Sequence, residues 1–346
     1  MNLETTREQE GTRPDNWVHF TPEPWAKEQV ALTIVIVNWN SGPLLKRCLA
    51  SIAQSNTGNR FEVVVVDNAS TDDSVAGLHA AFPRAGIIGN PSNIGFARAC
   101  NLGMDVARGR YLLLLNPDTE VAADTLDVMV GFMERTPEAG AAGCRVLNED
   151  GSLQTTCRRH LPRPLTSFLH LSGLLRLARH AEHWWTTLQG DAPHGRCHEN
   201  GLTRFLRRHE YEIHCSDEFQ VREVEALSGA FLLCRTELLR ELGGLDEDYF
   251  LFGEDLDLCY RINRHGGGVF RIYYVPDTTI THLRGKCREQ SPADSLRAGH
   301  DAMALFHRKH LAAEYPGILN QCVYTGIRIH YLVASAALFL HRRSRT

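Results

Sequence analysis

Polar side chains that could do chemistry stand at two places where the sequence leaves an apolar run. Asp118 ends a motif of amide, proline and carboxylate that directly follows the apolar residues 111–115. Glu254 and Asp255 open an amphipathic segment that begins after a glycine. A carboxylate at the first place could handle a metal ion or a phosphate. A carboxylate at the second could take a proton from a hydroxyl group.

The elements that would position Asp118 alternate between β-branched runs and amphipathic segments of helical length. This alternation is typical of right-handed βαβ crossovers, and we therefore expect an α/β fold with a parallel sheet. The expected strands are residues 33–37, 62–67, 86–89 and 111–115, and the expected helices are residues 44–54, 73–82 and 95–107.

A polar cluster follows each of these four strands. Because the carboxyl ends of parallel strands meet at one edge of a sheet, where ligands bind in open α/β folds, we expect the clusters to form one site. Each cluster alone could also be a turn or a helix cap, since Asp and Asn are common in both. The candidate residues are Asn38, Asn40, Asp67, Asn68, Asn93, Gly95, Asn116 and Asp118.

Composition narrows the class of protein. The chain has 346 residues and a formal net charge of −4, so it lacks the large basic field expected of a nucleic-acid partner. After the first strand it carries Asn-Trp-Asn-Ser-Gly-Pro in place of the glycine motif of a dinucleotide-binding dehydrogenase, which counts against NAD or FAD. Ten cysteines without a Cys-x-x-Cys pair and an N-terminus without a signal-peptide pattern indicate a cytoplasmic protein.

Four stretches of the first half resemble the nucleotide-sugar-binding half of family 2 glycosyltransferases. The resemblance implies a GT-A-type fold, which is a Rossmann-like, mostly parallel sheet flanked by helices. It assigns contact with the pyrimidine base to Asp67. The metal-binding Asp-x-Asp motif of the family falls on residues 116–118, so Asp118 carries over as a metal ligand, while Asn116 could hydrogen-bond a ribose or phosphate oxygen. The matching stretches are residues 33–40, 65–72, 93–97 and 114–118.

The second acidic motif has two interpretations. In the first interpretation the acids only stabilise a helix, because an acidic side chain at a helix N-terminus contributes about 0.3–1 kcal/mol. This effect alone would explain the presence of either Glu254 or Asp255. Residues 243–261, however, resemble the Glu-Asp motif of the same family, whose catalytic base maps to Asp255 with Glu254 beside it. Upstream, Ser228 and Gly229 lie in a strand-like stretch, residues 225–234, where backbone could approach the nucleotide sugar.

Two late residues complete the site by resemblance. A strand is expected over residues 269–275, and His282 then matches the histidine that completes the metal site in many GT-A-type enzymes. Arg284 lies on the same loop and could close over the diphosphate as a cation.

The resemblance implies a metal-dependent, inverting glycosyltransferase that uses Mg²⁺ or Mn²⁺ and a nucleoside-diphosphate sugar. The pattern is most similar to bacterial rhamnosyltransferases, which suggests dTDP-rhamnose as the donor and a glycan or lipid-linked hydroxyl as the acceptor. A sugar-nucleotide nucleotidyltransferase would need a glycine-rich and basic loop after the first strand, which is absent here. A non-catalytic sugar-binding module would need neither Asp118 nor Asp255.

The remaining chain is divided by composition. Residues 1–29 are polar and predict a flexible arm, and residues 318–341 are apolar but judged too short to cross a bilayer, which takes about 20 residues. Residues 318–341, together with a helix expected over residues 165–178, predict peripheral contact with the inner face of the cytoplasmic membrane. The expected divisions are a transferase domain over 30–290 (nucleotide-sugar half 30–150, acceptor half 151–290, insertion 158–220) and a helical region over 291–346.

Overall fold

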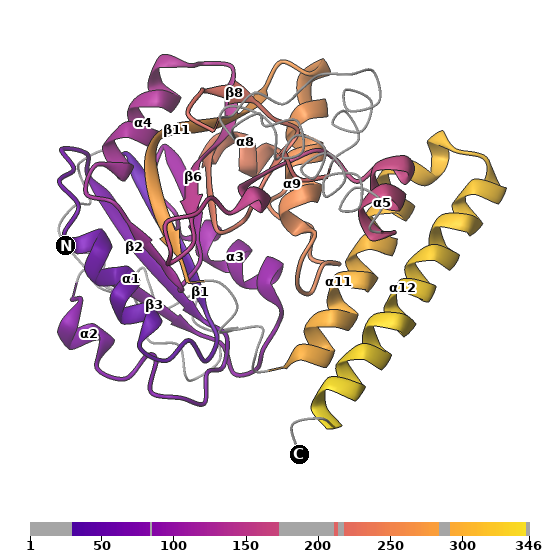
Figure 1. Cartoon of the computed structure of the whole chain (residues 1–346). Helices are drawn as coiled ribbons and strands as arrows, with labels where there is room; N and C mark the ends of the chain where they lie inside the picture. The colour runs from indigo at the N-terminus through magenta and orange to yellow at the C-terminus, as the bar shows by residue number, and fades with distance from the viewer. Residues whose placement is uncertain (1–29, 84, 173–210, 214–217, 284–290, 344–346) are drawn as a thin grey trace, which may run out of the picture.

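A nine-stranded sheet with helices packed on it forms the body of the molecule, and a helical hairpin projects from one side (Figure 1). The computed structural model describes residues 30–83, 85–172, 211–213, 218–283 and 291–343. Strands of the main sheet follow the order β3-β2-β1-β4-β10-β6-β11-β5, with β8 also paired to β11. The predicted α/β class and the C-terminal helices are confirmed.

The first half of the sheet is parallel, as the alternating pattern predicts. β1 pairs with β2 and β4, and β2 pairs with β3. Every residue of β1 and β4 is buried, which is why both read as unbroken apolar runs. The elements are β1 (Leu32–Asn38), α1 (Leu44–Ala53), β2 (Phe61–Asp67), α2 (Leu78–Ala81), β3 (Ala85–Gly89), α3 (Phe96–Asp105) and β4 (Tyr111–Leu115).

The second half of the sheet is mixed. β10 lies between β4 and β6 and is antiparallel to both, whereas β6 and β11 are parallel. β5 and β8 are antiparallel to β11, and β7 pairs with β9 in a separate small sheet. The elements are β5 (Thr119–Val121), α4 (Thr125–Arg135), β6 (Ala139–Leu147), β7 (Arg158–Arg159), α5 (Pro164–Leu171), β8 (Arg222–Glu223), β9 (Ala226–Leu227), β10 (Phe231–Arg235), α8 (Thr236–Glu241), α9 (Glu254–Arg264) and β11 (Arg271–His282).

Three predicted elements have different bounds. The helix expected over 73–82 is reduced to α2, because Gly77 adopts a left-handed conformation (φ 70°) immediately before it. The strand expected over 225–234 is divided into β9 and β10 by a turn. The strand expected over 269–275 begins at Arg271 and continues to His282, with an irregularity between Val275 and Thr279 that accommodates a proline. His282 therefore ends a strand.

The C-terminal hairpin consists of α11 (Pro292–Phe306) and α12 (Gly317–Arg343), joined by a π turn and a 3₁₀ turn. The prediction that this region is too short to span a bilayer was wrong. Residues 317–340 form one uninterrupted helical stretch that is long and apolar enough to cross a membrane by length and composition, because polar residues within it do not break the helix. Residues 1–29 lie outside the described part of the chain.

Candidate active site

The carboxyl ends of β1 and β2 are joined by a network of polar side chains. Asn38 is fully buried, and its Nδ2 donates to Asp67 Oδ1 (2.8 Å) and to the hydroxyls of Ser70 and Ser74 (2.9 Å each). Ser70 also donates to Asp67 through its hydroxyl (2.6 Å) and its backbone N–H (3.2 Å). The network holds Asp67 in place at the strand end, with Oδ2 accepting only the longer of these bonds.

A second network fixes the loop after β3. Asn68 Nδ2 donates to Asn93 Oδ1 (2.8 Å), and Asn68 Oδ1 accepts from the backbone N–H of Ile94 (3.0 Å). The loop ends at Gly95, where a Cβ would come within 2.9 Å of the backbone and ring of Phe250. Its φ of +91° also favours glycine. Asn68 and Asn93 therefore shape the loop, and Gly95 lets it pack against the turn that leads to α9.

Asn40 and Asn116 differ in how their side chains are used. Asn40 Oδ1 accepts from the backbone N–H groups of Thr71 (2.7 Å) and Asp72 (3.3 Å), which ties the first loop to the second. The side-chain amide of Asn116 makes no hydrogen bond with any residue that the structure describes. Of the two, Asn116 is the one with polar atoms left for a ligand.

Asp118 and His282 come together from strands β4 and β11, which lie far apart in sequence. His282 Nε2 is 3.2 Å from Asp118 Oδ1, and both side chains are largely buried. On the other side of the ring, Nδ1 is 3.0 Å from Gln154 Oε1. Gln154 is oriented by its Nε2, which donates to the carbonyl oxygens of His282 (2.8 Å) and Leu147 (3.4 Å). The Gln154 oxygen must therefore accept the Nδ1–H of His282.

This hydrogen-bond arrangement fits a divalent cation. With its proton on Nδ1, the neutral imidazole turns the Nε2 lone pair toward Asp118 Oδ1, so two acceptors face each other unless a proton or a cation lies between them. One carboxylate and one imidazole, with phosphate and water as further ligands, are a plausible donor set for Mg²⁺ or Mn²⁺. Within the described ranges there is no cluster of three or more potential protein ligands.

Asp255 opens α9 and is held by donors from two other segments. Its Oδ2 accepts from Arg159 Nη2 (2.6 Å) and from the backbone N–H of Gly229 (3.0 Å), while its Oδ1 accepts from the backbone N–H of Leu256 (2.7 Å). The side chains of Arg159 and Asp255 are only 11% and 13% exposed, so this ion pair is nearly buried. Oδ1 retains the lone pair with which a carboxylate could accept a proton.

Glu254 lies beside Asp255 but points into the protein. It is buried, and its Oε2 has no hydrogen-bond partner among the described residues. Burial and the neighbouring charge of Asp255 raise the pKa of Glu254 well above its usual range. Asp255, in contrast, is paired with the guanidinium of Arg159.

Short backbone contacts bring the two acidic motifs to one edge of the sheet. The N–H of Asn116 donates to the carbonyl of Ala230 (3.2 Å), next to the glycine that holds Asp255. The predicted grouping of Asp118, His282 and Asp255 at this edge is thus compatible with the fold. Ser228 makes a local bond, its hydroxyl accepting from the N–H of Ala230 (3.3 Å). Arg284 lies outside the described residues.

Sequence analysis missed Arg159 and Gln154. Both lie between β6 and α5 in a part of the chain without a βα pattern, and their roles depend on partners about 100 residues away. No local signal could have revealed them, although two adjacent arginines in a strand imply that an acid lies nearby if they are buried.

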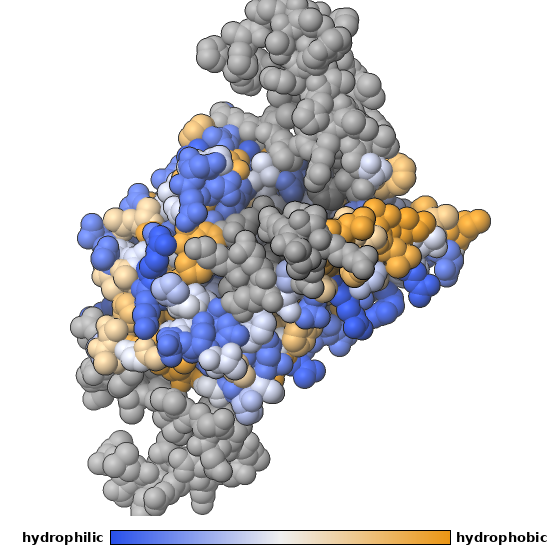
Figure 2. Space-filling model, turned by 60° about the horizontal axis from the view of Figure 1, so that its bottom comes forward, coloured by the Kyte–Doolittle hydropathy of each residue, from blue (hydrophilic) through white to orange (hydrophobic). Residues whose placement is uncertain are grey.

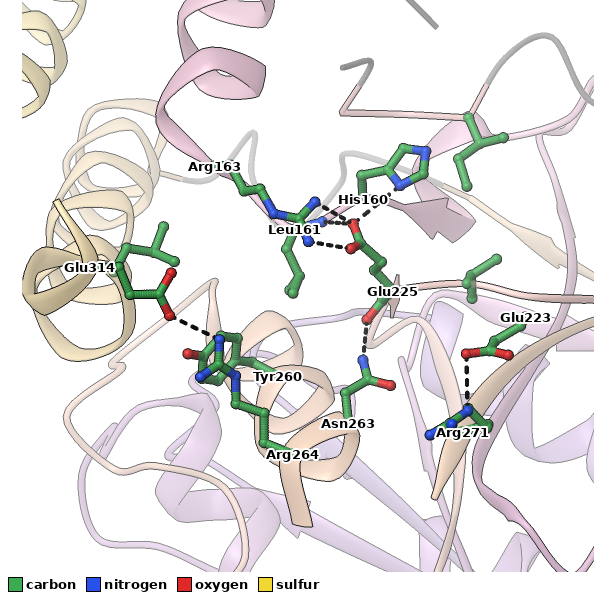
Figure 3. A pocket seen from close by; sticks show the side chains of 13 residues that line it. His160, Leu161, Arg163, Glu223, Glu225, Tyr260, Asn263, Arg264, Arg271 and Glu314 are labelled. Atoms are coloured by element: carbon green, nitrogen blue, oxygen red, sulfur yellow. Dashed lines mark hydrogen bonds and ion pairs between the residues drawn. The ribbon is translucent and has the colours of Figure 1, made fainter. Parts of the chain in front are cut away.

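A separate cavity of about 460 Å³ lies beside α9 (Figure 3). Glu225 lines it; burial alone would raise its pKa, but hydrogen bonds from His160 and Arg163 lower that pKa to about 2. Two further arginines that line the cavity also form ion pairs, Arg264 with Glu314 (2.9 Å) and Arg271 with Glu223 (3.3 Å). These internal pairs leave the cavity with a structural rather than a ligand-binding character.

The comparisons with known proteins define the class. Residues 33–192 match the family model "Glycosyl transferase family 2". Among solved structures, a mannosyltransferase from Pyrobaculum calidifontis crystallised with GDP-Man and Mn²⁺ aligns with a TM-score of 0.52 and 19% identity, covering 96% of this chain and 84% of that one. Residues 1–349 of S. aureus TarS align with a TM-score of 0.50 and 14% identity, covering 88% and 72%. The chain is a glycosyltransferase with a GT-A fold.

The relatives found by sequence comparison indicate a narrower class of transferase than the solved structures do. An N-acetylglucosaminyl-diphospho-decaprenol L-rhamnosyltransferase of Mycobacterium tuberculosis is 27% identical over 288 residues, which cover 80% of this chain and 83% of that protein. The chain therefore matches the family 2 glycosyltransferase model over residues 33–192 and resembles a bacterial rhamnosyltransferase over most of its length. The two alternatives, a nucleotidyltransferase and a non-catalytic module, are set aside because the matches are to glycosyltransferases along most of the chain.

Proposed function

We propose that this enzyme transfers a sugar from a nucleoside-diphosphate donor to a hydroxyl of a lipid-linked glycan, with inversion and with the help of Mg²⁺ or Mn²⁺. The best candidate donor is dTDP-rhamnose. The observation that supports the proposal is the Asp118–His282 pair, together with the hydrogen bond from Asn116 to Ala230, which brings the segment before Asp118 next to the glycine that holds Asp255. The rhamnosyltransferase relative supports the choice of sugar and the lipid-linked acceptor.

In this proposal the donor is bound by the strand ends of the parallel half. Asp67, held by Asn38 and Ser70, receives a hydrogen bond from the base through Oδ2. The Asn116 amide contacts a ribose or phosphate oxygen. Asp118 and His282 would hold the cation, which when bound would neutralise the negative charge on the departing diphosphate. Gln154 accepts from Nδ1–H of His282 and so orients the ring with Nε2 toward Asp118.

The acceptor is activated by Asp255. As the acceptor oxygen forms a bond to the anomeric carbon, the bond from that carbon to the diphosphate oxygen breaks, and Asp255 Oδ1 takes the hydroxyl proton. Arg159 and the N–H of Gly229 hold Oδ2, so the carboxylate cannot rotate away. Phe250, which is 56% exposed beside this site, offers a surface for the acceptor sugar.

The proposal also places the enzyme in the cytoplasm at the inner face of the membrane. Six of the seven cysteines described are buried, and all seven are free thiols, which suits a reducing compartment. A lipid-linked acceptor would be met at the membrane surface.

The test is a panel of nucleotide sugars with and without Mn²⁺, read first by thermal shift and then by transfer to a short-chain lipid-linked acceptor. A manganese-dependent shift with dTDP-rhamnose, followed by sugar transfer, is expected for the wild type. Asp118→Ala should remove the manganese dependence of the shift. A response to UDP-sugars alone would contradict the choice of donor, and full transfer in the presence of a chelator would contradict the role of the metal.

A further inference from the structure

The side of α12 that faces away from the rest of the molecule is apolar along its length. Leu332 and Val333 are 65% and 64% exposed, and Ile318 is 79% exposed. Between residues 317 and 340 Ile327 is buried, and the other residues are exposed or half-buried. Between residues 317 and 340 the only residue with a full charge is Arg328. We call this side the outer face, defined by Ile318, Ile329, Leu332, Val333 and Leu340, whose spacing places them on one side of a helix.

Helix α5 adds exposed apolar side chains beside α12. It contacts α12, and its Leu165 and Phe168 are 42% and 59% exposed. In Figure 1 α5 lies beside α12, whereas α11 lies between α12 and the sheet. Figure 2 shows apolar residues gathered along the projecting part of the molecule, bordered by hydrophilic ones. An apolar surface of this extent marks an interaction site.

We propose that the outer face docks on a lipid bilayer, with α12 lying in the plane of the interface and not across it. The inference deepens the proposed function, because it concerns how the enzyme meets a lipid-linked acceptor. A helix with one apolar side and a polar, packed opposite side lies in the headgroup region with the apolar side buried in the acyl boundary.

Helix α11 argues against a spanning position. The two helices are antiparallel neighbours, since His300 Nε2 contacts His330 Nδ1 (2.8 Å) and His307 Nε2 contacts Asn320 Oδ1 (2.8 Å). A spanning α12 would carry α11 with it into the hydrocarbon. Arg297 and Asp301 of α11 are each 74% exposed and would then lie near the bilayer centre, where charged side chains are costly.

Charge favours a bilayer as the occupant. Although the whole chain has a net charge of −4, the sequence from residue 341 onward is His-Arg-Arg-Ser-Arg-Thr, which carries three arginines. Basic residues that flank an apolar helix are attracted to anionic lipid headgroups. A second copy of the chain would bring these like charges together if the helices paired in parallel.

The hairpin is also fixed relative to the active site. His310, which follows α11, contacts Asp257 of α9 through Nε2 (2.6 Å), and its carbonyl accepts from Tyr260 (3.2 Å). Leu165 of α5 is six positions after Arg159, which holds Asp255, so the Cα atoms of these two residues are at most about 22 Å apart. A bilayer on the outer face would therefore lie close enough to present a membrane-anchored acceptor to Asp255.

The experiment measures binding of the full chain to vesicles of phosphatidylglycerol and phosphatidylethanolamine by co-sedimentation, without donor or acceptor. The double variant Leu332→Glu/Val333→Glu should bind at least about tenfold more weakly than the wild type, and Phe168→Glu a few-fold more weakly. Val269→Glu is the matched control, because Val269 is an equally exposed apolar residue (63%) in a turn of the sheet domain, and it should bind like the wild type.

Further readouts separate the possible failures. Equal melting temperatures verify that the variants fold, and alkaline carbonate should release the bound wild type, as expected for a helix in the interface. Resistance to carbonate would overturn the in-plane orientation. Equal vesicle binding by all variants would contradict the proposal that the outer face docks on a bilayer. The proposal would also be contradicted if the wild type bound no vesicles but formed a dimer that the double variant abolished. Transfer to a water-soluble acceptor tests the proposed function separately, and it should be the same in the double variant and the wild type.

Discussion

The two sides of the candidate site are built in different ways. On the donor side, Asn38, Asp67, Asn68 and Asn93 bond mainly to one another and to nearby loops, so each strand end is fixed by short polar networks. On the acceptor side, Asp255 is fixed by a nearly buried arginine from a distant segment. The donor side is held by many side-chain hydrogen bonds, whereas on the acceptor side Asp255 has one charged partner and two backbone N–H donors. Changes on the acceptor side should therefore have larger effects.

The largest effect is expected for Asp255→Asn. Because the amide cannot accept the hydroxyl proton, kcat should fall by about 10³-fold, within the range typical of general bases. Donor affinity, measured by calorimetry, should be unchanged, because the donor side is intact. Asp248→Asn is the control, since Asp248 is 69% exposed and close in sequence, and it should transfer sugar normally. Wild-type transfer by Asp255→Asn would mean that another group is the base.

The second effect concerns the ion pair. Arg159→Met leaves Asp255 unpaired and mostly buried, and the free energy of unfolding should fall by about 3 kcal/mol in urea denaturation. Arg163→Met removes an arginine that is 50% exposed, and it should cost no more than about 1 kcal/mol. If both variants lose the same small amount, the acceptor side does not depend on the buried pair.

A third change tests the proposed metal ligands, Asp118 and His282. Gln154→Leu removes the acceptor for the Nδ1–H of His282, and the affinity for Mn²⁺ should fall by about 10- to 100-fold in a direct binding titration. Gln154→Glu keeps an oxygen at the ring and should lose less. Unchanged Mn²⁺ binding by Gln154→Leu would show that His282 needs no orientation or does not bind the metal.

The smallest effect concerns Glu254 and pH. Burial and the charge of Asp255 raise the pKa of Glu254 above its ordinary value of 4.5, so the folded state favours the protonated form. The stability that this form contributes is fully present below the ordinary pKa and is lost as the pH rises through the raised pKa. Glu254→Gln cannot ionise, so its unfolding free energy should decline less than that of the wild type over this interval. Parallel curves would mean that Glu254 is already ionised when folded.

Prediction from sequence was most successful where the information is local. The strands β1, β2 and β4 follow from unbroken apolar runs, and the rule for parallel sheets places Asp67 and Asp118 at one edge. Prediction was least successful where a turn or a β-bulge sets the end of a strand or helix. The length of β11 could not be predicted, because a proline within it reads as the end of a strand and only pairing with β6 and β5 carries the strand onward to His282.

The α/β class, the polar clusters at the carboxyl edge and the acidic motif at the start of α9 can thus be predicted from the order of residues along the chain. The pairs that the side chains form, Asp118 with His282 and Asp255 with Arg159, become visible only once the chain is folded. It also decided that α12 is a continuous helix with an exposed apolar side. The physical reason is that periodicity and strand-end rules depend on neighbours along the chain, whereas ion pairs and exposed faces depend on which distant segments pack together.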